Sequence, residues 1–182
     1  MNRTGRALAM GCLLLLEPLL AQAGGNTLLV PAPSRCTLDS APADLPQAVA
    51  TCQQAAAGGD AEAQYELGRY YYDGKLTERD LNQALTYFEQ ASLKGHAEAQ
   101  YHLGLMFSRG EGVPANNIQA YIVLKMAAVN GAEDALDAAD EVTASMNPED
   151  LERATQVLGQ IFRKYLLELQ TADGRTPFSP LP

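Results

Sequence analysis

One stretch of this chain repeats itself, and the repeat constrains the fold more than any other feature. The segment GDAEAQYELGRYYYDG, residues 59–74, returns as GHAEAQYHLGLMFSRG at residues 95–110. Both segments begin with a glycine, and Gly131 follows after the same interval of 36 residues. A repeat of this length is typical of stacked helical arrays, in which each unit buries its apolar face only against its neighbours. We therefore predict an all-α solenoid.

The spacing of apolar residues predicts two antiparallel helices in each full unit. In unit one, residues 59–94, apolar side chains recur every three or four positions along 61–72 and again after Asp80. This is the period of an amphipathic helix, and aspartate is a favoured residue before the first turn of one. Unit two, residues 95–130, repeats the pattern, with Asn116 as the expected cap of its second helix.

A glycine lies in the middle of the first predicted helix of each unit, at Gly68 and Gly104. Glycine inside a helix costs about 1 kcal/mol relative to alanine. Its presence at both equivalent positions predicts that the partner helix approaches closely there.

The array is predicted to begin with a half unit and to end with a degenerate one. Residues 46–58 align with the second helix of unit one, whereas residues 131–170 keep the repeat only weakly. Asn147-Pro148-Glu149-Asp150 is a strong helix start, and the helix that follows, from Leu151 to about Gln170, is the longest that we expect. Its apolar side, suited to closing the open end of the array, consists of Leu151, Ala154, Leu158, Ile161, Phe162, Tyr165 and Leu169.

Residues 1–23 have the pattern of a secretory signal peptide. Arg3 and Arg6 precede an apolar run over residues 7–20, and Ala21-Gln22-Ala23 forms a small-x-small exit. A membrane anchor is the alternative, but the run is short for a span of roughly 20 residues and Glu17 interrupts it. A lipid anchor at Cys12 is a second alternative. We expect cleavage after Ala23 and an exported protein of a bacterial envelope, periplasmic or secreted.

The mature chain is expected to have an extended lead-in over residues 24–45 and a flexible tail over residues 171–182, because both are rich in proline and lack a helical period. Two cysteines remain after cleavage, Cys36 and Cys52. In an exported chain an even pair indicates a disulfide, worth about 3 kcal/mol for a loop of this length. Two buried free thiols are the alternative.

The charge of the chain excludes several classes of partner. Removing Arg3, Arg6 and Glu17 with the signal peptide leaves 11 basic and 21 acidic side chains, a net charge of −10. Such an acidic chain repels phosphate backbones and anionic lipid surfaces. We therefore predict no nucleic-acid partner and no membrane insertion after signal cleavage.

The repeat resembles a known family. The pattern A-x-A-Q-Y-x-L-G, then a loop and an alanine-rich helix ending in glycine, is similar to the Sel-one-like repeat, a relative of the tetratricopeptide repeat. The similarity covers residues 47–131, and residues 132–170 resemble a degenerate terminal unit. Unit one departs from the pattern at Lys75-Leu76-Thr77-Glu78, where unit two has Gly112 and Pro114. The resemblance implies a short right-handed α-solenoid of antiparallel helix pairs that serves as a scaffold or adaptor.

Motifs of known enzymes are missing from the sequence. There is no Ser-x-x-Lys, His-Glu-x-x-His or Gly-x-Ser-x-Gly motif. Residues 110–115 match the dinucleotide-binding pattern G-x-G-x-x-A, but no strand is expected before them, as that motif requires. His96 and His102 are six residues apart, so we expect two separate surface histidines. Some cysteine-rich relatives carry a β-lactamase label, but this chain lacks their cysteine pair in each unit. We predict no catalytic residue, metal or cofactor, and keep an envelope hydrolase as an alternative.

A binding surface for a protein or peptide is the remaining possibility. In related arrays the first helix of each unit lines the concave side, and the positions expected there are Glu62, Tyr65, Glu66, Arg69, Glu98, Tyr101, His102 and Leu105. An ordinary solvated helix face is the alternative, with the two tyrosines belonging to the core. A further alternative is a structural subunit that acts through its long last helix.

Overall fold

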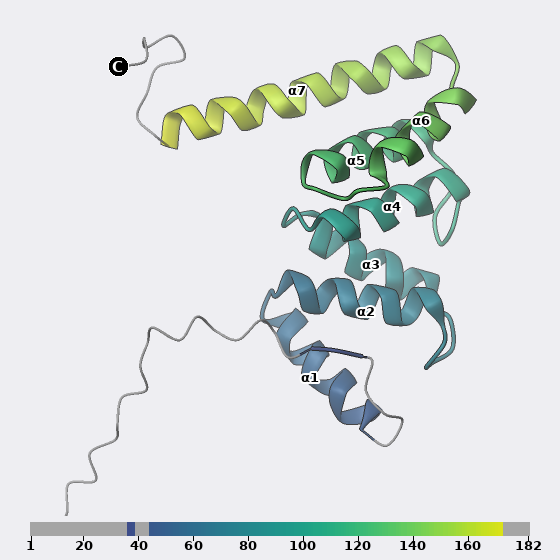
Figure 1. Ribbon diagram of the computed structural model, residues 1–182, viewed down its shortest axis with the longest axis vertical. Coiled ribbons are helices and arrows are strands. Elements are labelled where there is room, and N and C mark those ends of the chain that lie inside the picture. The colour runs from purple at the N-terminus through teal and green to yellow at the C-terminus, as the bar shows by residue number, and fades with distance from the viewer. Residues whose placement is uncertain (1–35, 39–43, 173–182) are drawn as a thin grey trace, which may run out of the picture. The chain divides into compact units, whose positions relative to one another are not determined.

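The computed structural model describes residues 36–38 and 44–172, with side chains up to residue 168. All of these residues lie within one compact unit, Pro33–Pro182. They form seven helices and no strand, which confirms the prediction of an all-α solenoid (Figure 1). The predicted signal peptide, most of the lead-in and the chain beyond residue 172 lie outside the described residues.

The helix bounds follow the repeat. They are α1 Leu45–Ala57, α2 Ala61–Asp73, α3 Leu81–Ser92, α4 Ala97–Arg109, α5 Asn117–Val129, α6 Ala135–Ser145 and α7 Pro148–Ala172.

Helices that follow one another along the chain pack side by side from α1 to α6. The first helices of successive units also touch, α2 with α4 and α4 with α6, whereas α3 and α5 do not pack together to the same extent. We call α2, α4 and α6 the A helices and their exposed side the A face. Because successive A helices are neighbours, side chains of α2 and α4 can meet there.

Side-chain caps begin the repeated helices. The Asp60 carboxylate accepts a hydrogen bond from the Ala63 amide at the start of α2, and Asp80 and Asn116 cap α3 and α5 in the same way, as predicted. The turns from α2 to α3 and from α4 to α5 start at Gly74 and Gly110, both with positive φ. These residues allow the chain to leave the helix in a left-handed conformation.

Close helix approach at the two mid-helix glycines is confirmed. A Cβ atom added at Gly68 would lie 2.5 Å from Cδ1 of Phe88, and one added at Gly104 would lie 2.6 Å from Cγ of Leu124. Phe88 and Leu124 come from the second helix of the same unit and are both fully buried. Each glycine therefore makes room for the largest core residue of the facing helix.

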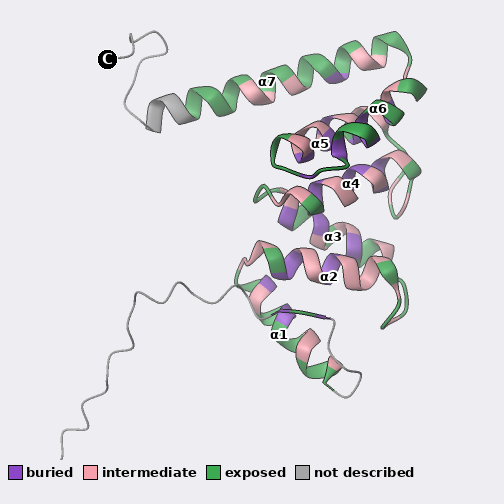
Figure 2. Ribbon diagram, in the orientation of Figure 1, coloured by how far each residue is buried: buried purple, intermediate pink, exposed green. Residues whose placement is uncertain are grey.

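Two main apolar cores run through the array (Figure 2). The larger one contains Phe88, Leu103, Met106 and Leu124 and joins α3 to α6. The smaller one packs α1 against α2 and includes Cys36, Leu38 and Cys52. Cys36 and Leu38 of the predicted lead-in are thus part of the folded structure at the start of the array.

The last helix closes the array only in part. Ala154 is fully buried, and Leu158, Ile161 and Phe162 are half-buried, whereas Tyr165 on the same side is 56% exposed. The reason is that α7 packs on α5 and then runs beyond it (Figure 1). Helix α7 also continues to Ala172, two residues into the predicted tail. Among the described residues, no helix is both long and apolar enough to cross a membrane.

Candidate functional site

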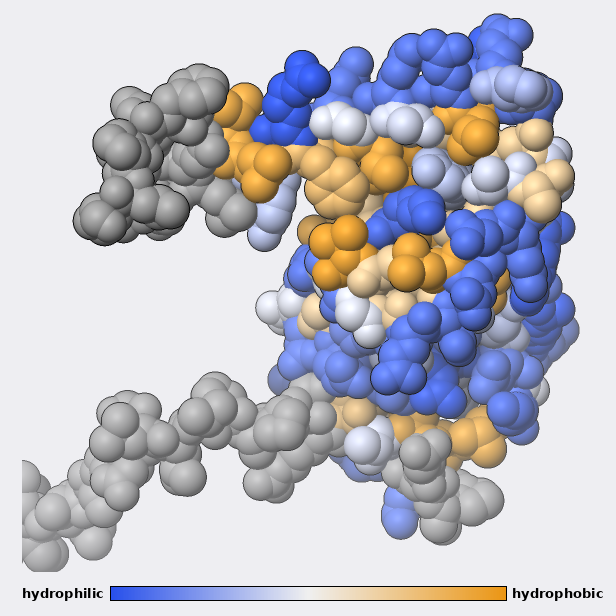
Figure 3. Space-filling model, turned by 45° about the horizontal axis from the view of Figure 1, so that its top comes forward, coloured by the Kyte–Doolittle hydropathy of each residue, from blue (hydrophilic) through white to orange (hydrophobic). Residues whose placement is uncertain are grey.

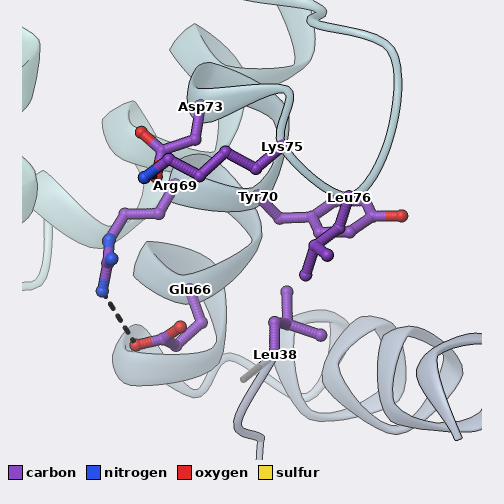
Figure 4. A pocket seen from close by; sticks show the side chains of 7 residues that line it. All are labelled: Leu38, Glu66, Arg69, Tyr70, Asp73, Lys75 and Leu76. Carbon is purple, nitrogen blue, oxygen red and sulfur yellow. Dashed lines mark hydrogen bonds and ion pairs between the residues drawn. The ribbon is translucent and has the colours of Figure 1, made fainter. Parts of the chain in front are cut away.

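A pocket of about 330 Å³ opens on the exposed side of α2 (Figure 4). Glu66, Arg69 and Asp73 reach it together because they lie three and four residues apart on one side of the helix. The other lining residues are Leu38 from the lead-in, Tyr70 from α2, and Lys75 and Leu76 from the turn after α2. The pocket therefore combines the A face of unit one with two segments that flank it.

The charged side chains of this pocket occur in pairs. Nζ of Lys75 lies 3.0 Å from Oδ2 of Asp73, and Nη1 of Arg69 lies 3.9 Å from Oε1 of Glu66. The Arg69 guanidinium also lies over the Tyr65 ring, 5.8 Å from its centroid. Groups of both signs thus surround the pocket, and all four can bond to a polar ligand that enters it.

The apolar wall of the pocket depends on the disulfide. Cys36 and Cys52 are bonded, with their Cα atoms 4.7 Å apart, and both are buried. Leu38, two residues after Cys36, is held against α1 and α2 with only 5% of its surface exposed. Sequence reasoning missed Leu38 as a site residue, because the sequence alone does not show that Leu38 packs against α1 and α2.

Tyr65 also belongs to a cluster of aromatic side chains from α2, α3 and the first part of unit two. The Tyr65 ring stacks on the His96 ring with centroids 4.5 Å apart, and the His102 ring stacks on the Phe88 ring at 5.0 Å. Tyr72 lies edge-on to both Phe88 and His102. This cluster joins units one and two across the A face.

Neither histidine is the surface residue that the sequence suggested. Nδ1 of His96 accepts the Ala99 amide as the cap of α4, and its Nε2 lies 3.1 Å from Oε2 of Glu62. The tautomer with hydrogen on Nε2 satisfies both contacts. His96 thus ties the start of α4 to α2, and only 15% of its side chain is exposed.

His102 is a partly buried member of the aromatic cluster. Burial lowers the pKa of its imidazole, and the positive charges of Arg69 and Arg109 lower it further, while Asp73 acts in the opposite direction. The prediction that His102 is a surface residue was wrong, because the six-residue spacing from His96 describes positions on α4 alone. It says nothing of α2 and α3, whose rings cover His102.

A polar bridge next to this cluster was also missed by sequence reasoning. The Tyr72 hydroxyl donates to Oε2 of Glu111 at 2.7 Å, and Nη2 of Arg79 lies 3.1 Å from Oε1 of the same carboxylate. Burial acts to raise the pKa of Glu111, but the bonds from Tyr72 and Arg79 outweigh it and lower that pKa. The bridge connects the turn between α2 and α3 with the turn between α4 and α5.

The predicted partner-binding residues therefore divide into two groups. Glu62 and Glu98 are exposed, and Glu66 and Arg69 line the pocket on α2. The other four, Tyr65, Tyr101, His102 and Leu105, are half-buried and pack against the core or its aromatic cluster. Of the predicted residues, all of which lie in the described part of the chain, Glu66 and Arg69 of α2 are the two that line this pocket.

Comparison with known proteins matches the repeat to a family. Residues 61–96 and 97–131 each match the model of the Sel1 repeat. These two segments are Sel1 repeats. Proteins with Sel1 repeats are protein–protein interaction modules. Among curated protein sequences, none matches this chain significantly.

Two solved structures with the same fold are longer than this chain. A protective antigen of uropathogenic Escherichia coli with an SLR fold, c5321, matches 75% of this chain at 25% identity and a TM-score of 0.62. A Sel1 repeat protein from Oxalobacter formigenes matches 54% of this chain at 34% identity and a TM-score of 0.53. The chain spans only 30% and 29% of their lengths.

Proposed function

We propose that this chain is an exported adaptor that binds a protein or peptide partner on the exposed side of α2. The observation that carries the proposal is the pocket on α2, where the predicted residues Glu66 and Arg69 lie beside the apolar side chains of Leu38 and Leu76. In the described part of the chain, the pocket on α2 is the place where a recess on the A face lies beside paired charges. Glu62 and Tyr65 extend the surface toward unit two.

The chemistry of the pocket suits an extended peptide segment. An apolar side chain of such a segment can enter beside Leu38, Tyr70 and Leu76, while its backbone groups or charged neighbours bond to Arg69 and Glu66. Binding sites of this kind combine an apolar recess with a few placed polar groups, which fix the orientation of the ligand. Four residues of α4 that the sequence predicts to bind a partner then contribute at the edge of the surface. They are Glu98, Tyr101, His102 and Leu105.

Export is the second part of the proposal. The charged start, apolar run and small-x-small exit of residues 1–23 support a cleaved signal peptide. The Cys36–Cys52 disulfide supports an oxidising compartment, such as the periplasm or the outside of the cell. The acidic charge of the chain supports a protein partner over nucleic acid or an anionic membrane.

A charge exchange tests the binding surface. The double variant Glu66→Arg with Arg69→Glu keeps the net charge but exchanges the two signs at the pocket. The matched control is Lys125→Glu with Asp140→Lys, which exchanges an ion pair of 3.6 Å between α5 and α6. Photoreactive residues placed at Leu76 capture the partner from intact cells, and its affinity for each variant is then measured.

We expect the Glu66 and Arg69 exchange to lower the affinity at least tenfold with an unchanged melting temperature, and the control exchange to leave the affinity unchanged. Equal affinities of the two variants would overturn the proposed surface. Capture of no protein from Leu76 would count against an adaptor role of α2.

A further inference from the structure

The pocket on α2 consists largely of residues that unit two does not repeat. Six of the residues that line it belong to unit one, and each differs in type from the residue 36 positions later. They are Glu66, Arg69, Tyr70, Asp73, Lys75 and Leu76. The four buried residues of α2, by contrast, all return unchanged in α4. The repeat therefore does not fix the residues at these six positions, and their chemistry is available to select a ligand.

Charged and apolar side chains lie on separate sides of this pocket (Figure 4). The apolar side chains of Leu38, Tyr70 and Leu76 are together on one side. The carboxylates of Glu66 and Asp73 are on the other side, seven residues apart on α2 and thus about 10 Å apart along the helix. A segment bound here therefore meets an apolar wall and two carboxylates at once.

The two carboxylates are less exposed than the basic groups paired with them. The side chains of Glu66 and Asp73 are 20% and 29% exposed, whereas those of Arg69 and Lys75 are 42% and 78% exposed. Separating an ion pair costs most for the less exposed partner, because water solvates the exposed one. A cation of the ligand that replaces Lys75 at Asp73 returns the ammonium group to water. An anion that replaced Asp73 at Lys75 would instead leave the less exposed carboxylate without its cation.

Arg69 can likewise give up its carboxylate to a ligand. Its Nη1 lies 3.9 Å from Oε1 of Glu66, which is longer than a hydrogen bond. Its guanidinium also lies 5.8 Å from the centroid of the Tyr65 ring, within the range of a cation–π contact. The contact with Tyr65 can therefore persist when a cation of the ligand approaches Glu66.

The charge around the pocket favours the same sign of ligand. The chain has a net charge of −9, and hydrophilic side chains cover much of the array on the face shown in Figure 3. Burial raises the pKa of the Tyr65 hydroxyl and Arg69 lowers it, while the charges of Glu98, Glu66 and Glu62 raise it further. Negative potential thus reaches the ring that Arg69 contacts. Such a field speeds the approach of a basic segment and repels an acidic one.

We propose that the segment bound at α2 is a basic peptide, in which lysine or arginine residues flank an apolar residue. The apolar side chain packs on Leu38 and Leu76, and the cations bind the carboxylates of Glu66 and Asp73. A separation of about 10 Å corresponds to about three residues of an extended chain, so two basic residues of one segment reach both carboxylates. This inference rests on the proposed binding function of the pocket and adds the sign of the ligand's charge.

Random peptides displayed on phage test the sign of the charge. They are selected on the purified protein with its disulfide intact, and pocket-dependent binders are those that Leu76→Ser no longer binds. Leu76 is 44% exposed, so circular dichroism should show an unchanged fold. We expect the pocket-dependent binders to be enriched in lysine and arginine beside an apolar residue. Enrichment in acidic residues, or no preference for either charge, would overturn the basic ligand but not the pocket, whereas the absence of pocket-dependent binders would overturn both.

The affinity of one selected peptide, measured by fluorescence anisotropy, tests the two carboxylates. The double variant Glu66→Gln with Asp73→Asn removes two negative charges at the pocket. The matched control, Asp137→Asn with Glu141→Gln, removes two exposed charges on α6 and leaves the chain with the same net charge.

We expect the pocket variant to bind at least tenfold more weakly than the control, and its affinity to depend less on salt than that of the parent. Equal affinities of the two double variants would overturn the proposal, because the peptide would then sense only the overall charge of the chain.

Discussion

Units one and two use equivalent positions of their first helices differently, and only unit two has an A helix before it. Glu66 and Arg69 of unit one line an open pocket, whereas their equivalents, His102 and Leu105, pack beside α2 and the core. Where unit two has α2 as its neighbour, unit one has α1 and the short segment around Leu38. The A face of unit two therefore packs in part against the chain itself, whereas the A face of unit one lines an open pocket.

The repeated glutamines show the same contrast inside the core. Nε2 of Gln64 donates to the carbonyl of Ala56, and Nε2 of Gln100 donates to the carbonyl of Ser92. Oε1 of Gln100 also accepts a hydrogen bond from Asn130, whereas Oε1 of Gln64 is buried without a hydrogen-bond partner among the described residues. The equivalent of Asn130 in unit one is Lys94, which instead donates to the carbonyl of Gly59.

Reducing the disulfide should have the largest effect, and it should be confined to α1 and α2 at the start of the array. Opening the Cys36–Cys52 bond removes the restraint on the start of the array and is expected to lower the free energy of unfolding by about 3 kcal/mol. Hydrogen exchange with and without reductant measures it by region. We expect α1 and α2 to lose protection while α4 and α5 keep theirs. An equal loss in both units would show that the array unfolds as one block.

Replacing the buried glutamine should lower the free energy of unfolding more in unit two, at Gln100, than in unit one, at Gln64. Gln100→Met leaves Asn130 and the Ser92 carbonyl without their partner, at a cost of about 2 kcal/mol. Gln64→Met leaves one carbonyl unpaired but also removes the unpaired Oε1, so its cost should be smaller by about 1 kcal/mol. Urea unfolding of both variants measures the difference. Equal costs would contradict the contrast between the two glutamines.

Adding a methyl group at the two mid-helix glycines should destabilise both units to a similar degree. In Gly68→Ala and Gly104→Ala the new Cβ atom overlaps the buried side chain of Phe88 or Leu124. Overpacking costs about 1–3 kcal/mol, and the gain in helix propensity offsets about 1 kcal/mol of it. The control is Gly159→Ala, where the added Cβ meets nothing within 4 Å and should stabilise α7. A neutral result at Gly68 or Gly104 would mean that the partner helix can yield.

Acid should weaken the packing of His102 of unit two on the rings of Phe88 and Tyr72 of unit one. Because the pKa of His102 in the folded protein lies below its ordinary value of 6.5, the unfolded chain binds a proton more readily. The stability due to His102 is therefore present above pH 6.5 and is lost as the pH falls below it. We expect the melting temperature to fall less between pH 7.5 and 5 in His102→Gln than in the parent. A parallel fall in both would place the acid sensitivity elsewhere.

Much of the fold follows from sequence alone because its determinants are local. The repeat, the caps at Asp80 and Asn116, and the glycines at Gly68 and Gly104 specify helices, turns and close packing within a unit. Each of these features depends on residues within one unit. They can therefore be predicted from the repeated sequence without knowing how the units pack together.

The candidate sites were decided by tertiary structure, because they depend on what lies beside each helix. The face periodicity of α4 could not show that the rings of α2 and α3 cover His102. Nor could it show that Leu38 completes the pocket beside Arg69, or that Tyr165 on the apolar side of α7 remains exposed. A helical pattern determines which residues share a face, but only the neighbours along the array determine which faces are covered and which remain open.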